Sequence, residues 1–331
     1  MDNEQIKATI LEYVQGSDHP DLDVYRRDVK PELLDLWLRR LDQYGALGGF
    51  QGQHILEAGC GFGWDAVGLS LKFDAKVTAT DILPSMIDGV TQCLAAMAAK
   101  GKPLNVEARQ ADICTLDLPD NSLGGIFSSE AVEHVHSLEA MYANCLRMLK
   151  PGARLLIVND SNCYNPEMRD RNREMWVERD ESFEHAQWLK EEVRPVEHAN
   201  AKPYQAMRED IIREAAPELS SEQVTKIARA TAGLVRPEIV AAVAAYQRDG
   251  SVPVRPENSW CRNPETGEYA ERLLDPFEMR DGLRAAGFRT QLRHLFTKMP
   301  HRLLNGIAIR PINEKLFGMR PQFVLVAEKP A

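Results

Sequence analysis

The chain has 331 residues, 44% of them apolar and 27% charged, which suits one domain with a large insertion or two domains. The composition is that of a soluble globular protein, and no apolar run is long enough to span a bilayer. The net charge of -9 argues against a long phosphate backbone as substrate, because affinity for nucleic acids comes mainly from Lys and Arg.

The cysteines and the first residues indicate where the protein works. Six cysteines are scattered without a C-x-x-C pair, which argues against a zinc site and against a disulfide framework. The opening MDNEQIKATILEYV is acidic and amphipathic, unlike a basic and apolar signal peptide. We therefore expect a cytoplasmic protein with reduced thiols, no metal and no membrane contact.

Helical periodicity comes first in the chain, at residues 4–15 and 31–44. Pro31 suits the first turn of the second helix. A polar connector, HPDLDVYRRDVK, lies between the two helices. The simplest interpretation is a helical cap on the edge of a sheet.

The next stretch, HILEAGCGFGWDAVGLSLKFDAKVTATD, is typical of a nucleotide site at the carboxyl edge of a parallel sheet. It predicts a strand at residues 54–58, followed by glycines at alternate positions, Gly59, Gly61 and Gly63. A helix at residues 64–73 and a second strand at residues 76–80 come next. Glycine is needed where the backbone turns sharply or lies against a ligand. Asp81 closes the second strand, and its carboxylate can accept from two ribose hydroxyls.

The glycine spacing distinguishes between nucleotides. A dinucleotide fingerprint reads G-x-G-x-x-G, but here Trp64 stands where the third glycine of that pattern belongs. Glu57 and Asp65 would oppose a pyrophosphate, whereas either could meet an ammonium group. The block E-A-G-C-G-F-G, with Asp81 after the next strand, resembles motif I and the acidic position that follows it in class I S-adenosylmethionine-dependent methyltransferases.

This resemblance implies a site for S-adenosylmethionine made by Glu57, the three glycines, and Asp81 with Ile82. The polar connector between the first two helices then has a second interpretation. It would close over the cofactor, with Tyr25 or Arg26 meeting the cofactor's carboxylate.

Further along, a helix over residues 84–99 precedes a strand at 104–111 that leads to Asp112 and Ile113. In the family this acidic position accepts from the adenine amino group, although an acid that caps a turn would look the same. Ser129-Glu130, after a strand at 123–128, resembles the family's motif at the end of strand four, which implies a cofactor contact for Glu130. The stretch A-V-E-H-V resembles the small-molecule, type 11-like branch. His134 within it is a candidate general base or a structural residue.

A helix at 138–149 and the run L-K-P-G-A-R-L-L-I-V, with a strand at 155–158, also resemble the family. After this strand about 110 mostly helical and highly charged residues follow. An insertion here starts at the sheet edge that carries the glycine turn, so we expect it to form a lid over the substrate. The candidate acceptor-binding residues are Asp160, Asn162, His185 and Trp260. Tyr164 and Glu257 join His134 as candidate catalytic residues, although the aromatic residues can equally pack within the lid.

The strand–helix order and two closing strands, at 288–296 and 322–328, predict an α/β fold. The resemblance implies a doubly wound, Rossmann-like sheet of seven strands with the last pair antiparallel. The expected regions are a helical cap at residues 1–50 and the cofactor-binding core at residues 51–160. The lid follows at residues 161–275, and the C-terminal completion of the sheet at residues 276–331.

The expected function is methyl transfer from S-adenosylmethionine to an O, N, C or S nucleophile of a small-molecule acceptor, without nucleic acid or membrane partners. Two alternatives are a nucleotide-dependent oxidoreductase and a cofactor-binding partner protein that has lost catalysis. The acids Glu57, Asp81 and Asp112 argue against such a loss. The apolar stripes of the insertion also allow a homodimer interface.

Overall fold

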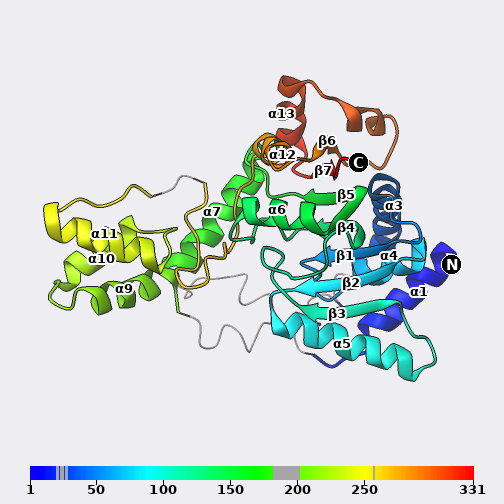
Figure 1. Cartoon of the computed structure of the whole chain (residues 1–331), viewed down its shortest axis with the longest axis horizontal. Coiled ribbons are helices and arrows are strands. Elements are labelled where there is room, and N and C mark those ends of the chain that lie inside the picture. Colours follow the sequence, from blue (N-terminus) through cyan, green and yellow to red (C-terminus); the bar gives the residue numbers. More distant parts are fainter. Residues whose placement is uncertain (20–21, 23–25, 27–28, 182–201, 256–257) are drawn as a thin grey trace. The chain divides into compact units, whose positions relative to one another are not determined.

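Seven strands form one mixed sheet in the first of two compact units (Figure 1). The computed structural model describes residues 1–19, 22, 26, 29–181, 202–255 and 258–331. The strands are β1 (His54–Ala58), β2 (Lys76–Asp81), β3 (Val106–Gln110), β4 (Leu123–Ser129), β5 (Leu149–Asn159), β6 (Arg289–His294) and β7 (Phe323–Glu328). Their order is β3-β2-β1-β4-β5-β7-β6; β1 to β5 are parallel, and β7 is antiparallel to both neighbours. The predicted doubly wound α/β sheet is confirmed.

Helices bury both faces of this sheet. Alternate strand residues point to opposite faces, so Ile55, Val77 and Phe127 share one apolar core with the helices of the N-terminal half. These helices are α1 (Asn3–Val14), α3 (Pro31–Gly48), α4 (Trp64–Phe73) and α5 (Pro84–Ala99). Leu56 and Ile126 are fully buried at the intervening positions. Helices α6 (Leu138–Met148) and α12 (Pro276–Ala285) pack on each other and on strands β5 to β7.

The connection between β6 and β7 is partly helical, as predicted. It contains the 3-10 helix η1 (His301–Gly306) and helix α13 (Arg310–Met319). No helix among the described residues is both long and apolar enough to cross a bilayer.

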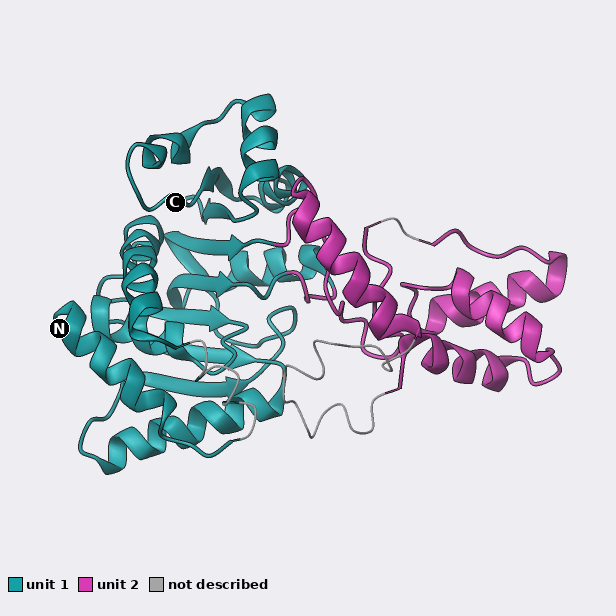
Figure 2. Ribbon diagram, turned by 180° about the vertical axis from the view of Figure 1, so that it is seen from behind, with its two compact units in different colours: residues 1–132, 137–160, 275–331 teal, residues 133–136, 161–274 magenta. Residues whose placement is uncertain are grey.

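The second unit comprises residues 133–136 and 161–274 and is coloured magenta in Figure 2. Its helices are α7 (Pro166–Glu181), α9 (Tyr204–Ala215), α10 (Ser221–Ala230) and α11 (Arg236–Asp249). Ile212, Ile227 and Ile239 meet in the core of α9, α10 and α11. On α7, Trp176 packs edge-on against Trp260, with 5.4 Å between ring centroids. The unit therefore has cores of its own.

Some predicted boundaries are wrong for identifiable reasons. Helix α3 continues past Tyr44 to Gly48. Gly45 lies inside it, because the ring of Phe73 packs where a Cβ at this position would lie. Tertiary packing thus outweighs the low helix propensity of glycine. Strand β3 begins at Val106 instead of residue 104. The helix predicted over 167–193 is described only as far as Glu181, and its remainder lies outside the described residues.

Strand β5 begins at Leu149, six residues before the predicted start, although Lys150-Pro151-Gly152 looks like a stop signal. Its pairing with β4 is irregular, since Leu123 pairs with Leu149 but Gly125 pairs with Arg154. The backbone N–H of Gly152 donates to the carbonyl of Lys329, just beyond β7. Contacts with Leu123 of β4 and with Lys329 after β7 therefore include this stretch in the strand.

Candidate functional site

Three strand ends of the first unit meet at one edge of the sheet. Strands β1, β2 and β4 are parallel neighbours, so their carboxyl ends bring the glycine turn, Asp81 and Glu130 to the same edge. In open α/β sheets a ligand binds outside this edge, where the strand order reverses. Here β1 is the first strand, and the chain proceeds from it in both directions across the sheet.

The turn after β1 requires glycine. Gly59, Gly61 and Gly63 have φ angles of 74°, 50° and 74°, in the left-handed region that residues with a Cβ avoid. A Cβ on Gly59 would also lie 2.2 Å from that of Ala131. The N–H groups of Gly59 and Cys60 both donate to the carbonyl of Thr80, which ties the turn to β2. The left-handed φ angles at the three positions therefore explain why each of them is glycine.

Glu57, the last acid before the turn, is buried with an exposed fraction of 2%. Its Oε2 atom has no hydrogen-bond partner among the described residues. Burial raises the pKa of Glu57 well above its usual value, and the nearby carboxylates of Asp65 and Asp81 raise it further. A buried carboxyl with an unpaired oxygen is costly unless a ligand completes it.

Asp65, in the first turn of α4, is also buried but has a partner. The indole N–H of Trp37 donates to its Oδ1 atom. Burial raises the pKa of Asp65 to about 6, while the Trp37 hydrogen bond and the charge of Arg40 oppose the shift. Trp37 also stacks on Trp64, with 6.4 Å between ring centroids. Asp65 therefore belongs to the packing between α3 and α4.

Asp81 holds the turn from the next strand. Its Oδ2 accepts from the N–H of Gly61 and its Oδ1 from the N–H of Leu83, both at 3.0 Å. Each carboxylate oxygen can accept more than one hydrogen bond, which suits hydroxyl donors. The neighbouring Ile82 is 40% exposed, which offers an apolar surface beside the carboxylate.

Asp112 follows β3 and caps the turn after it. Its Oδ1 accepts from the N–H of Cys114 at 2.8 Å, and Ile113 beside it is 8% exposed. A turn cap was the alternative interpretation of this acid, and the hydrogen bond is compatible with both roles, because the carboxylate retains further acceptor positions.

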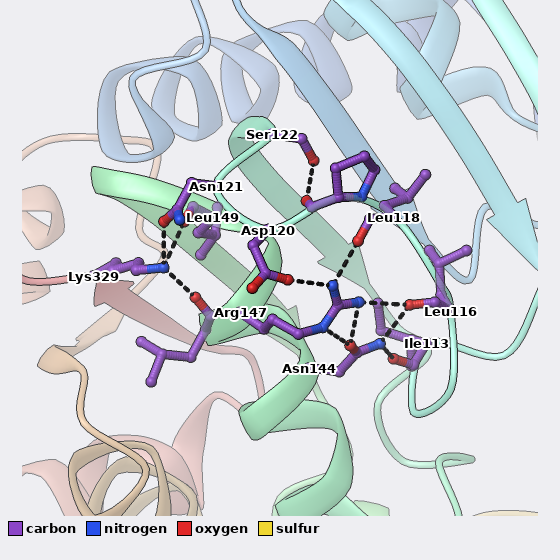
Figure 3. A network of polar contacts seen from close by, with 12 residues as sticks. Ile113, Leu116, Leu118, Asp120, Asn121, Ser122, Asn144, Arg147, Leu149 and Lys329 are labelled. Atoms are coloured by element: carbon purple, nitrogen blue, oxygen red, sulfur yellow. Dashed lines mark hydrogen bonds and ion pairs between the residues drawn. The ribbon is translucent and has the colours of Figure 1, made fainter.

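Helix α6 fixes the loop that carries Asp112 and Ile113 (Figure 3). Asn144 donates to the carbonyls of Ile113 and Leu116 at 2.9 and 3.0 Å. Arg147 donates to the carbonyls of Leu116 and Leu118 at 3.1 and 2.6 Å. The sequence contains no local sign of this network, since its partners are about 30 residues apart.

Glu130 stands at the end of β4 with a φ of 47°, which is unusual for a residue other than glycine. Its Oε2 accepts from the N–H of Asp160 at 2.9 Å, and its Oε1 from the side chain of Gln322 at 3.3 Å. Glu130 and Asp160, a predicted cofactor contact and a predicted acceptor contact, are thus bonded to each other.

The first helix contributes a residue that the sequence analysis did not single out. The hydroxyl of Tyr13 donates to the carbonyl of Phe62, within the glycine turn, at 2.9 Å. Arg26, proposed as a cofactor contact, donates its Nε to the carbonyl of Val14 at 2.9 Å. Tyr25 lies outside the described residues. Helix α1 therefore supports the turn directly.

In the second unit, His134 belongs to a group with two acids. The side-chain ligand atoms of Glu133, His134 and Glu271 lie within 4.8 Å of one another. The Nδ1 atom of His134 is 3.1 Å from the carbonyl of Tyr269, which can only accept, so Nδ1 carries the proton and Nε2 is the basic nitrogen. The His134 side chain is 45% exposed, and partial desolvation disfavours its charged form. The charges of Glu133, Glu271 and Glu268, with the Tyr269 carbonyl, outweigh that effect and raise the pKa of His134.

The other predicted acceptor and catalytic residues have mixed surroundings. Asn162 is fully buried, and its Oδ1 accepts from the N–H groups of Tyr164 and Asn165 at 2.9 and 3.2 Å. Trp260 is 7% exposed in the core that includes Trp176. Packing within the insertion was the alternative interpretation of this aromatic residue. His185 and Glu257 lie outside the described residues.

Comparison with known proteins identifies the central part of the chain. The family described as "Methyltransferase domain" matches residues 56–157. An O-methyltransferase of Pyrenophora dematioidea is 32% identical over 119 residues, covering 35% of this chain and 43% of the relative. Phosphoethanolamine N-methyltransferase 1 of Arabidopsis thaliana is 34% identical over 106 residues, covering 32% of this chain and 21% of the relative. The chain thus spans less than half of each of these two curated relatives.

Solved structures are similar at lower identity. Phosphoethanolamine N-methyltransferase 2 of Haemonchus contortus, in complex with S-adenosyl-L-methionine, is 13% identical with a TM-score of 0.46, and the match covers 89% of this chain and 53% of that one. The sequence match to residues 56–157 includes the turn, Asp81, Asp112 and Glu130. This part of the chain is therefore similar to methyltransferase domains, and the strand order agrees with the doubly wound sheet that the resemblance implied.

Proposed function

We propose that this protein transfers the methyl group of S-adenosylmethionine to an O, N, C or S nucleophile of a small-molecule acceptor. The observation that carries the proposal is Glu57, a buried carboxyl with one oxygen unpaired within the described part of the chain, next to a turn of three left-handed glycines. The relatives that match this part of the chain are named O- and N-methyltransferases, which supports oxygen or nitrogen as the first acceptor atoms to test.

The residues at the sheet edge fit this cofactor. The unpaired Oε2 of Glu57 suits an ammonium group, which would supply the missing donor and the missing positive charge. The carboxylate of Asp81 is an acceptor that suits ribose hydroxyls, and the exposed Ile82 offers an apolar surface for a base. Asp112 and the N–H of Ile113 suit the polar edge of the base.

When bound, this cofactor supplies a methyl group on a positively charged sulfur. In an in-line displacement the acceptor's lone pair forms the new bond to carbon, and the electrons of the broken bond go to sulfur. Holding the reacting atoms in line supplies much of the rate. The chain's contribution is therefore a rigid edge, and Tyr13, Asn144 and Arg147 support it through backbone carbonyls of the loops.

We assign acceptor recognition and proton removal to the second unit. This assignment is supported by its attachment points, because Glu133 follows the end of β4 by four residues and Ser161 follows the end of β5 by two. His134 is oriented by Tyr269 with Nε2 as its basic nitrogen. An acceptor that must lose a proton would pass it to this nitrogen. Because the pKa of His134 is raised, the ring becomes a neutral base at a higher pH than an ordinary histidine does, and turnover is expected to rise with pH accordingly.

Binding and turnover test the proposal separately. Calorimetry is expected to show binding of S-adenosylhomocysteine and no binding of NADH. Formation of S-adenosylhomocysteine is then measured with phenols, hydroxy acids and phosphorylated amino alcohols as acceptors. Binding of NADH alone would favour the oxidoreductase alternative, and binding of S-adenosylhomocysteine without turnover on any acceptor class would favour a non-catalytic protein.

A further inference from the structure

The C-terminal part of the first unit has a charge opposite to that of the whole chain. Residues 287–322 contain seven Lys or Arg residues and a single acid, Glu314, whereas the chain carries a net charge of -9. Five of the seven lie in residues 298–320, here named the basic segment, which includes η1 and α13. Glu314 is paired with Arg310 at 2.8 Å. Lys298, Arg302, Lys315 and Arg320 make no ion pair with any described residue.

The basic segment also exposes large apolar side chains. Twelve such side chains are exposed among the described residues, and five of them fall within these 23 residues. They are Met299, Leu303, Ile309, Ile312 and Met319, with exposed fractions of 65%, 72%, 59%, 42% and 68%. Single exposed apolar residues are normal, but a group of this density marks an interaction surface.

Polar side chains of the same segment are turned inward. Asn305 is buried and exchanges hydrogen bonds with the backbone of Phe296, accepting at 2.8 Å and donating at 3.0 Å. Asn313 is buried, bonds His294 at 2.9 Å and donates to the carbonyl of Ile307 at 2.8 Å. These two buried amides, together with the buried Leu316 and Phe317, fix the inner side of the segment and leave the other apolar side chains exposed.

Helix α13, labelled in Figure 1, has one buried face and one exposed apolar face. Its buried residues, Asn313, Leu316 and Phe317, are spaced as one helix face. Ile312 and Met319 are seven residues apart, so they share another face, and both are exposed there. The cationic Lys315 lies between them in the sequence and on the same side by its spacing.

We propose that the basic segment binds the surface of an anionic membrane. A bilayer interface accepts this combination, because apolar side chains enter the acyl boundary while Lys and Arg reach the phosphates. The unpaired cations complement anionic headgroups, and they would be a liability in a purely apolar protein interface. The protein would then rest on the membrane without spanning it, in contrast to the expectation of no membrane contact.

Vesicle flotation with the full chain tests the proposal. We expect the protein to float with phosphatidylcholine vesicles containing about 30% phosphatidylglycerol, and to float weakly or not at all with phosphatidylcholine alone. Raising the salt from about 0.1 M to about 1 M is expected to release most of it. Equal binding to both vesicle types, or binding to neither, would overturn the proposal.

Two variants separate the two contributions. Leu303→Ser with Ile309→Ser is expected to weaken vesicle binding about tenfold or more, since it removes two exposed apolar side chains. Lys298→Gln, Arg302→Gln, Lys315→Gln and Arg320→Gln together are expected to remove the preference for anionic vesicles. Val177→Ser with Val240→Ser is the matched control, because both valines are exposed elsewhere, at 47% and 43%, and it is expected to bind like the parent.

All these positions are exposed, so normal melting of each variant is expected and is checked first. Light scattering excludes the competing occupant. If Leu303→Ser with Ile309→Ser converts a dimer to a monomer and vesicle binding is absent in the parent, the segment is a protein interface and the proposal is wrong. Binding of S-adenosylhomocysteine is measured alongside, and its retention in all variants shows that the outcome is independent of the methyltransferase proposal.

Discussion

The two units treat buried charge in opposite ways. In the second unit, Arg208 and Asp180 are both fully buried and form two hydrogen bonds of 2.7 and 2.9 Å, and the Nε of Arg208 donates to the carbonyl of Ala228. In the first unit, Glu57 and Asp65 are buried without a comparable cation among the residues that the structure describes, and one oxygen of Glu57 has no hydrogen-bond partner among them. A buried ion pair with all its hydrogen bonds made stabilises the fold, whereas a buried carboxyl that lacks a donor can bind one from a ligand.

This comparison gives each buried group a different expected response. Removing a partner from the completed pair costs folding stability. Removing the carboxyl charge at the sheet edge costs ligand binding and leaves stability unchanged or improved.

The largest effect is expected for Arg208→Met. It leaves Asp180 buried, with Arg255 at 3.7 Å as the nearest remaining cation, and is expected to cost about 3 to 5 kcal/mol of unfolding free energy. Urea denaturation measures this loss. The double variant Arg208→Met with Asp180→Leu removes both charges and is expected to recover most of it. A single variant as stable as the parent would show that the pair contributes nothing to the fold.

Asp81→Ala is expected to act on binding. It leaves ribose hydroxyls unpaired and is expected to weaken binding of S-adenosylhomocysteine by about 2 to 4 kcal/mol. Because Asp81 also holds the N–H groups of Gly61 and Leu83, part of this loss comes from a looser turn. Asp81→Asn keeps one acceptor oxygen and so retains one of the two contacts to the turn, and comparing it with Asp81→Ala separates the two contributions. An unchanged dissociation constant in a variant that melts normally would remove Asp81 from the site.

The sequence predicts those parts of the site whose contacts join residues close together in the chain. The turn and Asp81 were predicted because alternate glycines and an acid after a strand are local patterns. The left-handed backbone of Glu130 and its bonds to Asp160 and Gln322 have no local sign, since they depend on β4, β5 and β7 meeting in space.

The same limit applies beyond the site. Arg208 and Asp180 look like ordinary solvated charges in a highly charged helical stretch, and only the packing of α7 against α9 shows that they are buried. Asn305 and Asn313 look like loop residues, yet they are the inward anchors of the basic segment. Strands and glycine turns were predictable because their patterns repeat over a few residues, whereas the partner of a buried polar group is chosen by tertiary structure.

Glu57→Gln is expected to change the pH dependence of binding. The carboxyl of Glu57 has a raised pKa in the free protein, because it is buried and lies near Asp65 and Asp81. A bound ammonium group would lower that pKa, so binding releases a proton and affinity rises with pH, by up to about tenfold per pH unit. Calorimetry in buffers of different ionisation enthalpy measures the proton release.

In Glu57→Gln we expect binding weakened by about 1 to 2 kcal/mol and a pH dependence that is lost. His134→Asn is the matched control, since its ring belongs to the second unit and its loss is expected to leave proton release unchanged. Proton release that persists in Glu57→Gln would assign the linked group elsewhere.

The smallest effect is expected for Asp65→Asn, and it runs in the stabilising direction. The folded-state pKa of Asp65 is about 6, above the value of 3.8 in an unfolded chain, because the carboxyl is buried. The folded protein therefore holds this proton more tightly, and the stability that Asp65 contributes below about pH 4 is lost as the pH rises through about 6. Asn retains an oxygen that can accept from Trp37 and carries no charge to desolvate, but it loses the favourable interaction of a negative charge with the N-terminus of α4.

At pH 7.5 the net gain in the free energy of unfolding is expected to be about 1 kcal/mol, and at pH 4 the variant and the parent are expected to be equally stable. Urea denaturation at both pH values measures the difference. A variant that is less stable at pH 7.5 would show that Asp65 is ionised and stabilising there, so that Trp37 and Arg40 outweigh the cost of its burial.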